Sequence, residues 1–282
     1  MPPVLFDSQG SSRSPVRLGP LLLRSPVMAA AGTVRPLDVL ASDALGAVVT
    51  PSYTTRARAG RPATLREVVG GALLTPATAS QATSGVVRRY TTAWAAARTP
   101  VIVSLLVDEY AEYTAAAAEL EGVAGTVAME LNVAWGATDG LVAEDPALAR
   151  HAVRQVRQVC RLPVIVKLPF DLADPEATLD ACRDAGAIAA VVASGVPTGD
   201  GMFLGPATFP LVLELVRRLA RRAPLPLVAC GGIATAAHAR AYLDVGAAAV
   251  QVGSAHLANP RAAEEIAAEL ATAGFAARPG NA

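Results

Sequence analysis

Lysine, cysteine and aromatic residues are scarce in this sequence, and each scarcity narrows what the chain can be. Lys167 is the only lysine among 24 basic residues, so every other basic residue is an arginine. The three cysteines, Cys160, Cys182 and Cys230, lie far apart without a CxxC pair, which argues against a disulfide framework or a zinc-binding pattern. Aromatic residues make up 4% of the chain, too few for a surface that stacks nucleic-acid bases.

Long apolar runs and an excess of charge are also missing. No apolar run approaches the roughly 18 residues that cross a membrane. The first residues do not combine a basic segment with an apolar stretch, as a signal peptide would. The 24 acidic residues balance the 24 basic ones. We therefore expect a cytoplasmic protein that binds a small-molecule substrate and contacts neither membranes nor nucleic acid.

What the sequence does contain is a large apolar content arranged in short runs. Hydrophobic residues make up 52% of the chain and charged residues 17%, which is enough to bury a large core. Nearly continuous apolar runs are expected for strands that are buried on both faces. They cover residues 26–31, 46–52, 100–106, 126–133, 163–168, 188–194, 226–232 and 248–254.

Helical patterns separate several of these runs. They cover residues 109–121, 145–160, 175–185, 209–222 and 234–245. Asp145 followed by Pro146, and Asp174 followed by Pro175, are each typical of an N-cap with proline in the first helical turn. Eight strand–helix units predict an α/β protein that folds as a closed (β/α)8 TIM barrel.

The whole chain, residues 1–282, is predicted to be one barrel domain. Residues 1–25 are expected to form a short N-terminal β-hairpin that caps the bottom of the barrel. Proline and glycine are spread along the chain instead of gathering in a linker, so no internal boundary is predicted. An open doubly wound sheet is the alternative, but no G-x-G-x-x-G follows the first predicted strand.

The carboxyl ends of the strands are where a barrel places its active site. Lys167 lies one residue before the end of the fifth predicted strand. In a chain that otherwise uses arginine, a lysine here indicates a site that needs a compact ammonium on a flexible stem. The seventh and eighth strands end in Gly231–Gly232 and Gly253–Ser254. This pattern is typical of a phosphate site built from backbone N–H groups.

In the order and content of its strand ends, the chain resembles the dihydroorotate dehydrogenase family of FMN-dependent barrels, and most closely the bacterial class 1 branch. The resemblance covers most of the chain and implies an oxidoreductase that acts on CH–CH bonds. It rests on PVMAAAGT from Pro26, PVIVSL from Pro100, AMELNV from Ala128, PVIVKL from Pro163, and PLVACGGIATAAHARAYLDVGAAAVQVGSA from Pro226.

The resemblance also implies which residues hold FMN. Gly231, Gly232, Gly253 and Ser254 would bind its phosphate. Lys167 matches the lysine beside flavin N1 and the C2 carbonyl, where a cation stabilises the negative charge of the reduced ring. The other implied cofactor residues are Ala30, Ala31, Gly32, Ser52, Ser104, Asn132, Ser194, Gly195, Gly205 and Cys230.

The substrate side of the family pattern is altered in this chain. The family's N-x-S-C-P-N loop reads NVAWGA from Asn132, so Trp135 stands where the base that deprotonates dihydroorotate is expected. An indole cannot accept that proton. Pro51 replaces the lysine of the family's T-K-S, Ala193 replaces the asparagine of its I-N-T, and residues 75–81 lack its asparagine-glycine-leucine stretch. Trp135 is expected either to fill part of the space above the flavin or to cap the barrel.

Several residues are candidates to replace this base. Asp139, in the same loop as Trp135, is the first candidate. Glu130 shares the parity of Asn132 and therefore points into the barrel one layer deeper, where a structural role is expected. Weaker candidates are Tyr53, Ser84 and Asp200. The histidines, which are not expected to be catalytic, are His151, His238 and His256.

These features predict an FMN-dependent oxidoreductase that resembles dihydroorotate dehydrogenase and acts on a flat or apolar substrate other than dihydroorotate. The alternative is dihydroorotate dehydrogenase itself, which oxidises dihydroorotate to orotate in pyrimidine biosynthesis. Two further hypotheses are a lyase that uses Lys167 as a Schiff-base nucleophile and a non-catalytic accessory barrel. The resemblance implies a homodimer. An iron–sulfur or NAD site would require an electron-transfer partner subunit, because the sequence has neither pattern.

Overall fold

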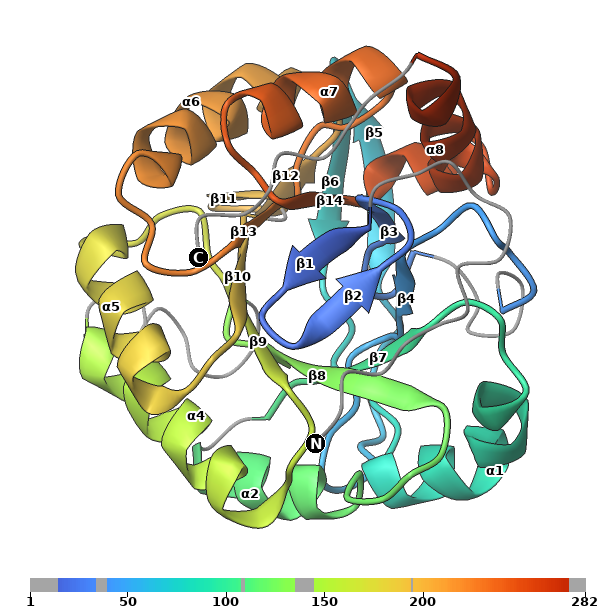
Figure 1. Cartoon of the computed structure of the whole chain (residues 1–282), viewed down its shortest axis with the longest axis vertical. Coiled ribbons are helices and arrows are strands. Elements are labelled where there is room, and N and C mark those ends of the chain that lie inside the picture. Colours follow the sequence, from blue (N-terminus) through green and yellow to red (C-terminus); the bar gives the residue numbers. More distant parts are fainter. Residues whose placement is uncertain (1–14, 34–39, 108–109, 135–144, 194, 274–282) are drawn as a thin grey trace.

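The chain folds around a closed barrel of eight parallel strands, seen nearly end-on in Figure 1. The computed structural model describes residues 15–33, 40–107, 110–134, 145–193 and 195–273. In sequence order the barrel strands are β3 (Val27–Ala29), β4 (Ala47–Val49), β7 (Val101–Leu105), β8 (Thr126–Asn132), β9 (Val164–Leu168), β10 (Ala189–Val192), β13 (Leu227–Ala229) and β14 (Ala249–Val252). Each pairs with the next, and β14 pairs with β3. The closed barrel confirms the predicted fold class and excludes the open sheet.

Helices surround the barrel and bury their apolar faces against it (Figure 1). They are α1 (Thr83–Ala95), α2 (Tyr110–Ala118), α4 (Pro146–Val159), α5 (Pro175–Ala185), α6 (Phe209–Ala220), α7 (Ala236–Asp244) and α8 (Ala262–Thr272). In α4 the buried residues are Ala149, Ala152, Val153 and Val156, spaced three or four apart on one face. This periodicity is the reason that helix could be recognised in the sequence.

Helix ends follow the capping signals in the sequence. The Asp145 carboxylate accepts a hydrogen bond from the backbone N–H of Ala147 at 2.8 Å, and Asp174 accepts one from Ala177 at 2.9 Å. Gly186 ends α5 in the left-handed region with φ 97°, where a side chain would be strained. The predicted N-caps of α4 and α5 are therefore confirmed.

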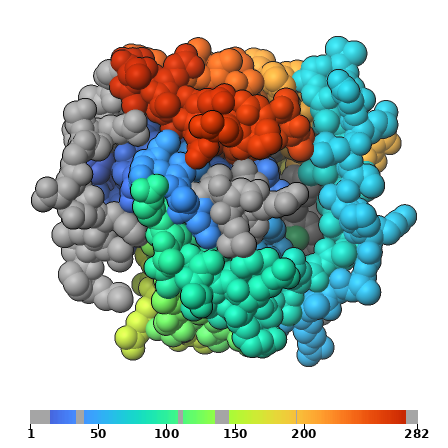
Figure 2. Space-filling view, turned by 90° about the vertical axis from the view of Figure 1, so that its right-hand side faces the viewer, coloured from blue at the N-terminus to red at the C-terminus, as the bar shows by residue number. Residues whose placement is uncertain are grey.

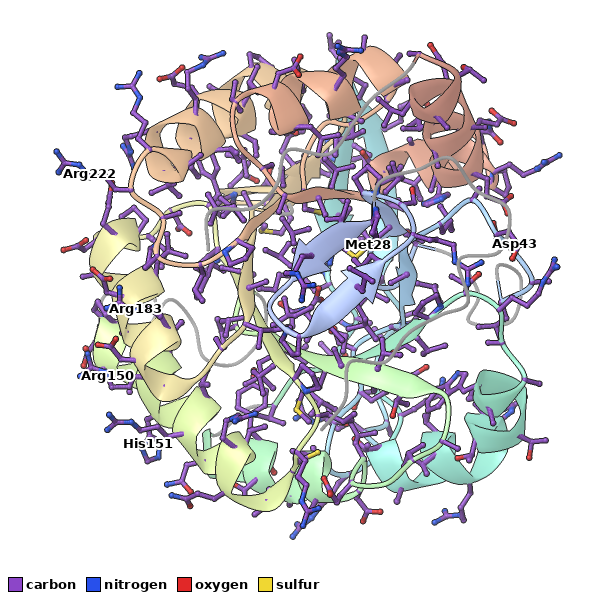
Figure 3. All side chains as sticks on the ribbon, in the orientation of Figure 1. Met28, Asp43, Arg150, His151, Arg183 and Arg222 are labelled. Atoms are coloured by element: carbon purple, nitrogen blue, oxygen red, sulfur yellow. The ribbon has the colours of Figure 1, made fainter. Side chains whose placement is uncertain are left out.

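A short antiparallel hairpin, β1 (Val16–Leu18) and β2 (Leu21–Leu23), lies against the barrel interior, as predicted. The first and last residue of each strand are buried in one apolar cluster with interior residues such as Met28 and Ile165. Figure 3 places Met28 at the centre of the molecule behind this hairpin. The hairpin therefore closes the end of the barrel at which its strands begin.

A second, antiparallel sheet was not expected from the sequence. It joins β5 (Thr64–Val68), β6 (Gly71–Thr75), β11 (Val196–Thr198) and β12 (Gly201–Leu204) in the order β11-β12-β6-β5. In Figure 2 the hairpin β5–β6 stands at the end of the molecule opposite β1–β2. Its strands are exposed or half-buried, unlike the barrel strands, and β5 and β11 lack continuous apolar runs.

Some predicted boundaries were wrong by one to three residues, and two helices were not predicted. The barrel strands end earlier than the apolar runs, because residues such as Pro51 and Gly232 already belong to the loops. Helices α1 and α8 are rich in threonine and alanine and give a weak periodic signal. Within the described residues, no helix has the length and apolar character needed to cross a bilayer.

Candidate functional site

The barrel interior is apolar at its base and polar at the carboxyl ends of the strands. Side chains alternate along a strand, so every second residue points inward. On β9, Ile165 is therefore in the apolar layer and Lys167 lies one layer above it. On β8, Ala128 is in the apolar layer and Glu130 lies above it. The polar layer is thus a direct consequence of the strand sequences.

Lys167 lies almost completely buried in this polar layer, facing a buried carboxylate. Its side chain is 4% exposed, and its Nζ is 3.8 Å from Oε1 of Glu130, whose side chain is 0% exposed. The pairing register explains the approach. Lys167 lies beside Asn132 on the neighbouring strand, and Glu130 points inward two residues earlier. The structure therefore places the single lysine at the predicted end of the strand, within a buried ion pair.

Glu130 is held on its other sides by two neutral donors. Ser104, from β7, donates its hydroxyl to Oε1 at 3.3 Å. Gln251, from β14, donates its side-chain amide to Oε2 at 2.8 Å. Strands β14 and β8 lie on opposite sides of the barrel, so this second hydrogen bond crosses the interior. The carboxylate is thus fixed by groups from three strands.

The same network continues towards the barrel mouth. The Ser104 hydroxyl lies 2.9 Å from that of Ser52, which follows β4. Asn132, at the end of β8, donates its side-chain amide to Ser52 at 3.1 Å, and its side-chain oxygen accepts from the backbone N–H of Ala134. Predicted cofactor residues from three separate segments therefore form one hydrogen-bonded chain with Glu130.

The protonation of Lys167 depends on this neighbourhood. Burial has the largest single effect and lowers the pKa of Lys167, but the groups around it, the Glu130 carboxylate first among them, together raise that pKa above its ordinary value. Burial raises the pKa of the Cys230 thiol, which keeps it protonated. Lys167 is therefore a permanent ammonium, and Cys230 is an unreactive neighbour packed beside it.

The glycines after β13 have a backbone that other residues rarely adopt. Gly231 has φ 156° and Gly232 has φ 65°. A Cβ on Gly232 would lie 2.4 Å from the backbone nitrogen of Phe209, at the start of α6. Among the described residues, the N–H groups of Gly231 and Gly232 donate to no acceptor. They remain available to an anion.

The loop after β14 is joined to the loop after β3 by a buried histidine. Gly253 precedes the 3-10 turn η2 (Ser254–Leu257), which contains His256. Nδ1 of His256 lies 3.1 Å from the hydroxyl of Thr33, which donates to the carbonyl of Ala30 at 2.8 Å. Because that hydroxyl proton is already used, the ring nitrogen is the donor to Thr33.

The loop after β3 leaves free space next to its backbone at the position predicted for the flavin. Ala30 is buried and its N–H donates to the carbonyl of Val252 at 2.9 Å, so the first and last barrel strands stay together. Gly32 has φ 72°, and a Cβ there would lie no closer than 4.0 Å to its nearest neighbour, Pro51. Together with Ala31, these residues line the same end of the barrel as Gly253.

Other predicted residues lie apart from this group or outside the described residues. A Cβ on Gly205 would lie 2.5 Å from the Cα of Gly71, so this glycine allows β12 to pack on the β5–β6 hairpin. Gly195 similarly contacts Leu204 of β12. The predictions that fall outside the described residues are Trp135, Asp139 and Ser194.

The weaker base candidates are unsuited to the role. Burial raises the pKa of Tyr53 well above its ordinary value, so the phenol stays protonated. Asp200 is exposed on the turn between β11 and β12, 3.7 Å from Arg66. Ser84 is in the first turn of α1, outside the hydrogen-bonded network. His151 points away from the barrel on the outer side of α4, as Figure 3 shows.

Sequence reasoning missed two members of the site and one strained residue. Gln251 is a polar residue within an apolar strand, and that interruption was the available signal. Thr33 gave no signal, since its partner His256 is more than 200 residues away. Ala193, after β10, has φ 54°, a conformation that asparagine tolerates better than alanine.

The residues present fit a flavin nucleotide. FMN needs an anion site for its phosphate and a donor beside the pyrimidine edge of its ring. The free N–H groups of Gly231 and Gly232 suit the first, and the Lys167 ammonium suits the second. The side-chain oxygen of Gln251 is buried without a partner in the described residues, which shows that the interior network is not internally saturated.

Comparison with known proteins agrees with this geometry. A sequence model of the family described as dihydroorotate dehydrogenase matches residues 17–273. The chain is 33% identical, over 92% of its length and 91% of the relative's, to the dihydroorotate dehydrogenase B (NAD(+)), catalytic subunit, of Desulforudis audaxviator. It is 31% identical to the protein of the same name from Geobacter sp. strain M21, over 90% of this chain and 91% of the relative.

The agreement confirms the predicted resemblance and the predicted class of enzyme, a dihydroorotate dehydrogenase-like oxidoreductase. It lends no support to a change of substrate, which was the main reading of the sequence. With most of its length matched and its barrel closed as expected, this chain belongs to the dihydroorotate dehydrogenase family.

Proposed function

We propose that this chain is an FMN-dependent oxidoreductase that oxidises dihydroorotate to orotate. The observation that carries the flavin is the buried Lys167–Glu130 pair, at the same barrel end as the N–H groups of Gly231 and Gly232, which have no acceptor among the described residues. Bound FMN would accept the hydride that is removed from the substrate. The names of the matched relatives support dihydroorotate as the substrate.

Each group of site residues would have a role set by its position in the barrel. Gly231, Gly232 and Gly253 would bind the phosphate through backbone N–H groups. Lys167 would hold a positive charge beside the ring, in a buried environment where that charge acts strongly. Ser52 and Asn132, hydrogen-bonded to one another, would orient the face on which the substrate lies.

A second candidate is a flat substrate other than dihydroorotate, and the substrate-side sequence favours it. Pro51 stands where the resemblance expects a lysine, and Trp135 stands where it expects the base. Loss of a general base costs roughly 10²- to 10⁴-fold in rate. Oxidation of dihydroorotate by this chain would then require another proton acceptor, and Asp139 remains the candidate.

The electrons would leave through a partner. The matched relatives are named catalytic subunits of an NAD(+)-dependent enzyme. We propose that this chain also assembles with an electron-transfer subunit, and that its barrels form a homodimer. We place it in the cytoplasm, as one barrel domain.

An absorbance spectrum followed by substrate reduction tests the proposal. The purified protein should be yellow, and its flavin should bleach on anaerobic addition of dihydroorotate. Bleaching by photoreduction but not by dihydroorotate would reject that substrate and support the second candidate. A colourless protein that FMN cannot reconstitute would reject the flavin itself. Borohydride trapping of a carbonyl compound on Lys167 would instead indicate the Schiff-base lyase.

A further inference from the structure

The buried carboxylate of Glu130 has no part in the division of roles given above, yet it has the most enclosed position in the site. We propose that Glu130, held by Ser104 and Gln251, is a positioning residue that keeps Lys167 as an ammonium with its N–H groups directed to a ligand. The inference rests on the proposed function, because it deepens the role of Lys167 towards a flavin.

The distances show that Lys167 and Glu130 interact through their charges and not through a hydrogen bond. Nζ of Lys167 is 3.8 Å from Glu130 Oε1, beyond the reach of a good hydrogen bond. Both carboxylate oxygens instead accept hydrogen bonds from neutral donors, Ser104 on one and Gln251 on the other. The carboxylate thus acts on the ammonium through its charge, while the ammonium protons have no hydrogen-bond acceptor within the part of the chain that the structure describes.

The ammonium could not persist in this position without the carboxylate. An unpaired buried lysine loses its proton readily, with shifts of up to roughly 3 to 5 pKa units. Among the described residues, the titratable groups acting on Lys167 are Glu130 from β8 and Cys230 after β13. The Cys230 thiol is neutral, because burial raises its pKa. Glu130 is therefore the only charge in that set that can retain the proton.

Gln251 fixes the orientation of the Glu130 carboxylate. A carboxylate can only accept, so the Gln251 amide presents its N–H₂ group to Oε2, and its own oxygen has no partner among the described residues. Leaving that buried acceptor unsatisfied has a cost in stability. A simple packing residue would avoid that cost. The hydrogen bond is retained across the whole barrel interior, which is expected if the direction of the carboxylate matters.

The composition of the chain offers a direct measurement. Lys167 is the only lysine, so protein grown with ¹³C-labelled lysine gives a single side-chain Cε signal. Its titration in the FMN-free protein reports the Lys167 pKa without any contribution from flavin or activity. We expect wild-type Lys167 to titrate above 10.5. We expect Glu130→Gln to lower that pKa by roughly 3 units, to below 9, as for a buried lysine without a partner.

Two further variants make the result specific. Glu130→Asp keeps the charge and should restore at least part of the wild-type pKa. Glu67→Gln makes the same chemical change on the exposed strand β5 and should leave the Lys167 pKa unaltered. A wild-type pKa below 10.5, or an unchanged pKa in folded Glu130→Gln, would overturn the proposal. If Glu130→Gln does not fold, the wild-type titration still decides it.

The flavin-loaded protein provides the second readout. In Glu130→Gln the reduction potential of bound FMN should fall below the wild-type value at about pH 9 but not at about pH 6, because only at the higher pH is the ammonium lost. Equal potentials at both pH values would contradict the positioning role. A protein that binds no FMN but retains the expected Lys167 titration would refute the proposed function and leave the pairing intact.

Discussion

Lys167 and Glu130 are the residues whose energetics are most tightly linked to the site. Each is buried, and each compensates the charge of the other. Breaking a buried pair by removing one partner typically costs about 3 to 5 kcal/mol, because the remaining charge is stranded. The longer separation of this pair, 3.8 Å, favours the lower end of that range.

We therefore predict that Lys167→Met lowers the free energy of unfolding by about 3 kcal/mol. The double variant Lys167→Met with Glu130→Gln should recover most of that loss, because no buried charge remains. Urea unfolding of the single and double variants in the FMN-free state measures the difference. Additive losses in the double variant would show that the two side chains are not energetically coupled.

His256 gives a second residue-scale prediction, on pH dependence. Burial lowers the pKa of His256 below its ordinary value of 6.5, against the raising effect of the Gly253 carbonyl. The unfolded state therefore binds a proton first as the pH falls. The stability that neutral His256 contributes is complete above 6.5 and is lost as the pH falls below that value.

Urea-unfolding midpoints measured above and below pH 6.5 should show a loss of stability at the lower pH in the wild type. The midpoint of His256→Gln should change less with pH. His151→Gln, on the exposed side of α4, serves as the control and should keep the wild-type slope. The same slope in His256→Gln as in the wild type would assign the acid sensitivity to other groups.

At the scale of single elements, the loop between β13 and α7 can adopt its conformation only because position 232 has no side chain. Gly232 lies in the left-handed region, and a Cβ there would lie 2.4 Å from the nitrogen of Phe209. Its carbonyl and that of Gly231 also contact α7 through His238 and Tyr242. Displacement of this loop would move the predicted phosphate site.

We predict that Gly232→Ala costs about 3 kcal/mol of stability, from backbone strain together with the clash. Gly122→Ala is a matched control, because Gly122 has φ 73° and open space around it. The control should cost only the strain, about 1 kcal/mol, and should retain FMN. Thermal unfolding and flavin retention measure both effects. Equal costs for the two variants would exclude the clash.

At the scale of the whole molecule, the hairpin β1–β2 completes the barrel interior. Leu18, the last residue of β1, is fully buried, whereas Leu65, at the opposite end of the molecule in β5, is 47% exposed. Leu18→Ala should therefore cost about 3 kcal/mol through cavity formation, and Leu65→Ala less than about 0.5 kcal/mol. Chemical denaturation of the two variants makes the comparison. A small loss for Leu18→Ala would mean that the hairpin contributes little to the core.

Most of the barrel could be predicted because its signals are local. Runs of apolar residues, aspartate caps and the Gly186 turn are each defined by adjacent residues. The sheet of β5, β6, β11 and β12 could not be predicted in the same way. Its strands are only three to five residues long, and β6 pairs with β12, more than 100 residues later.

The sequence by itself determined the eight-strand barrel and the position of Lys167, because two-residue alternation directs every second side chain of a strand inward. Only the tertiary structure decided what Lys167 faces. Closure of the barrel brings Gln251 of β14 across to Glu130 of β8, residues 121 positions apart. No local pattern encodes that contact, since it exists only after the first and last strands have paired.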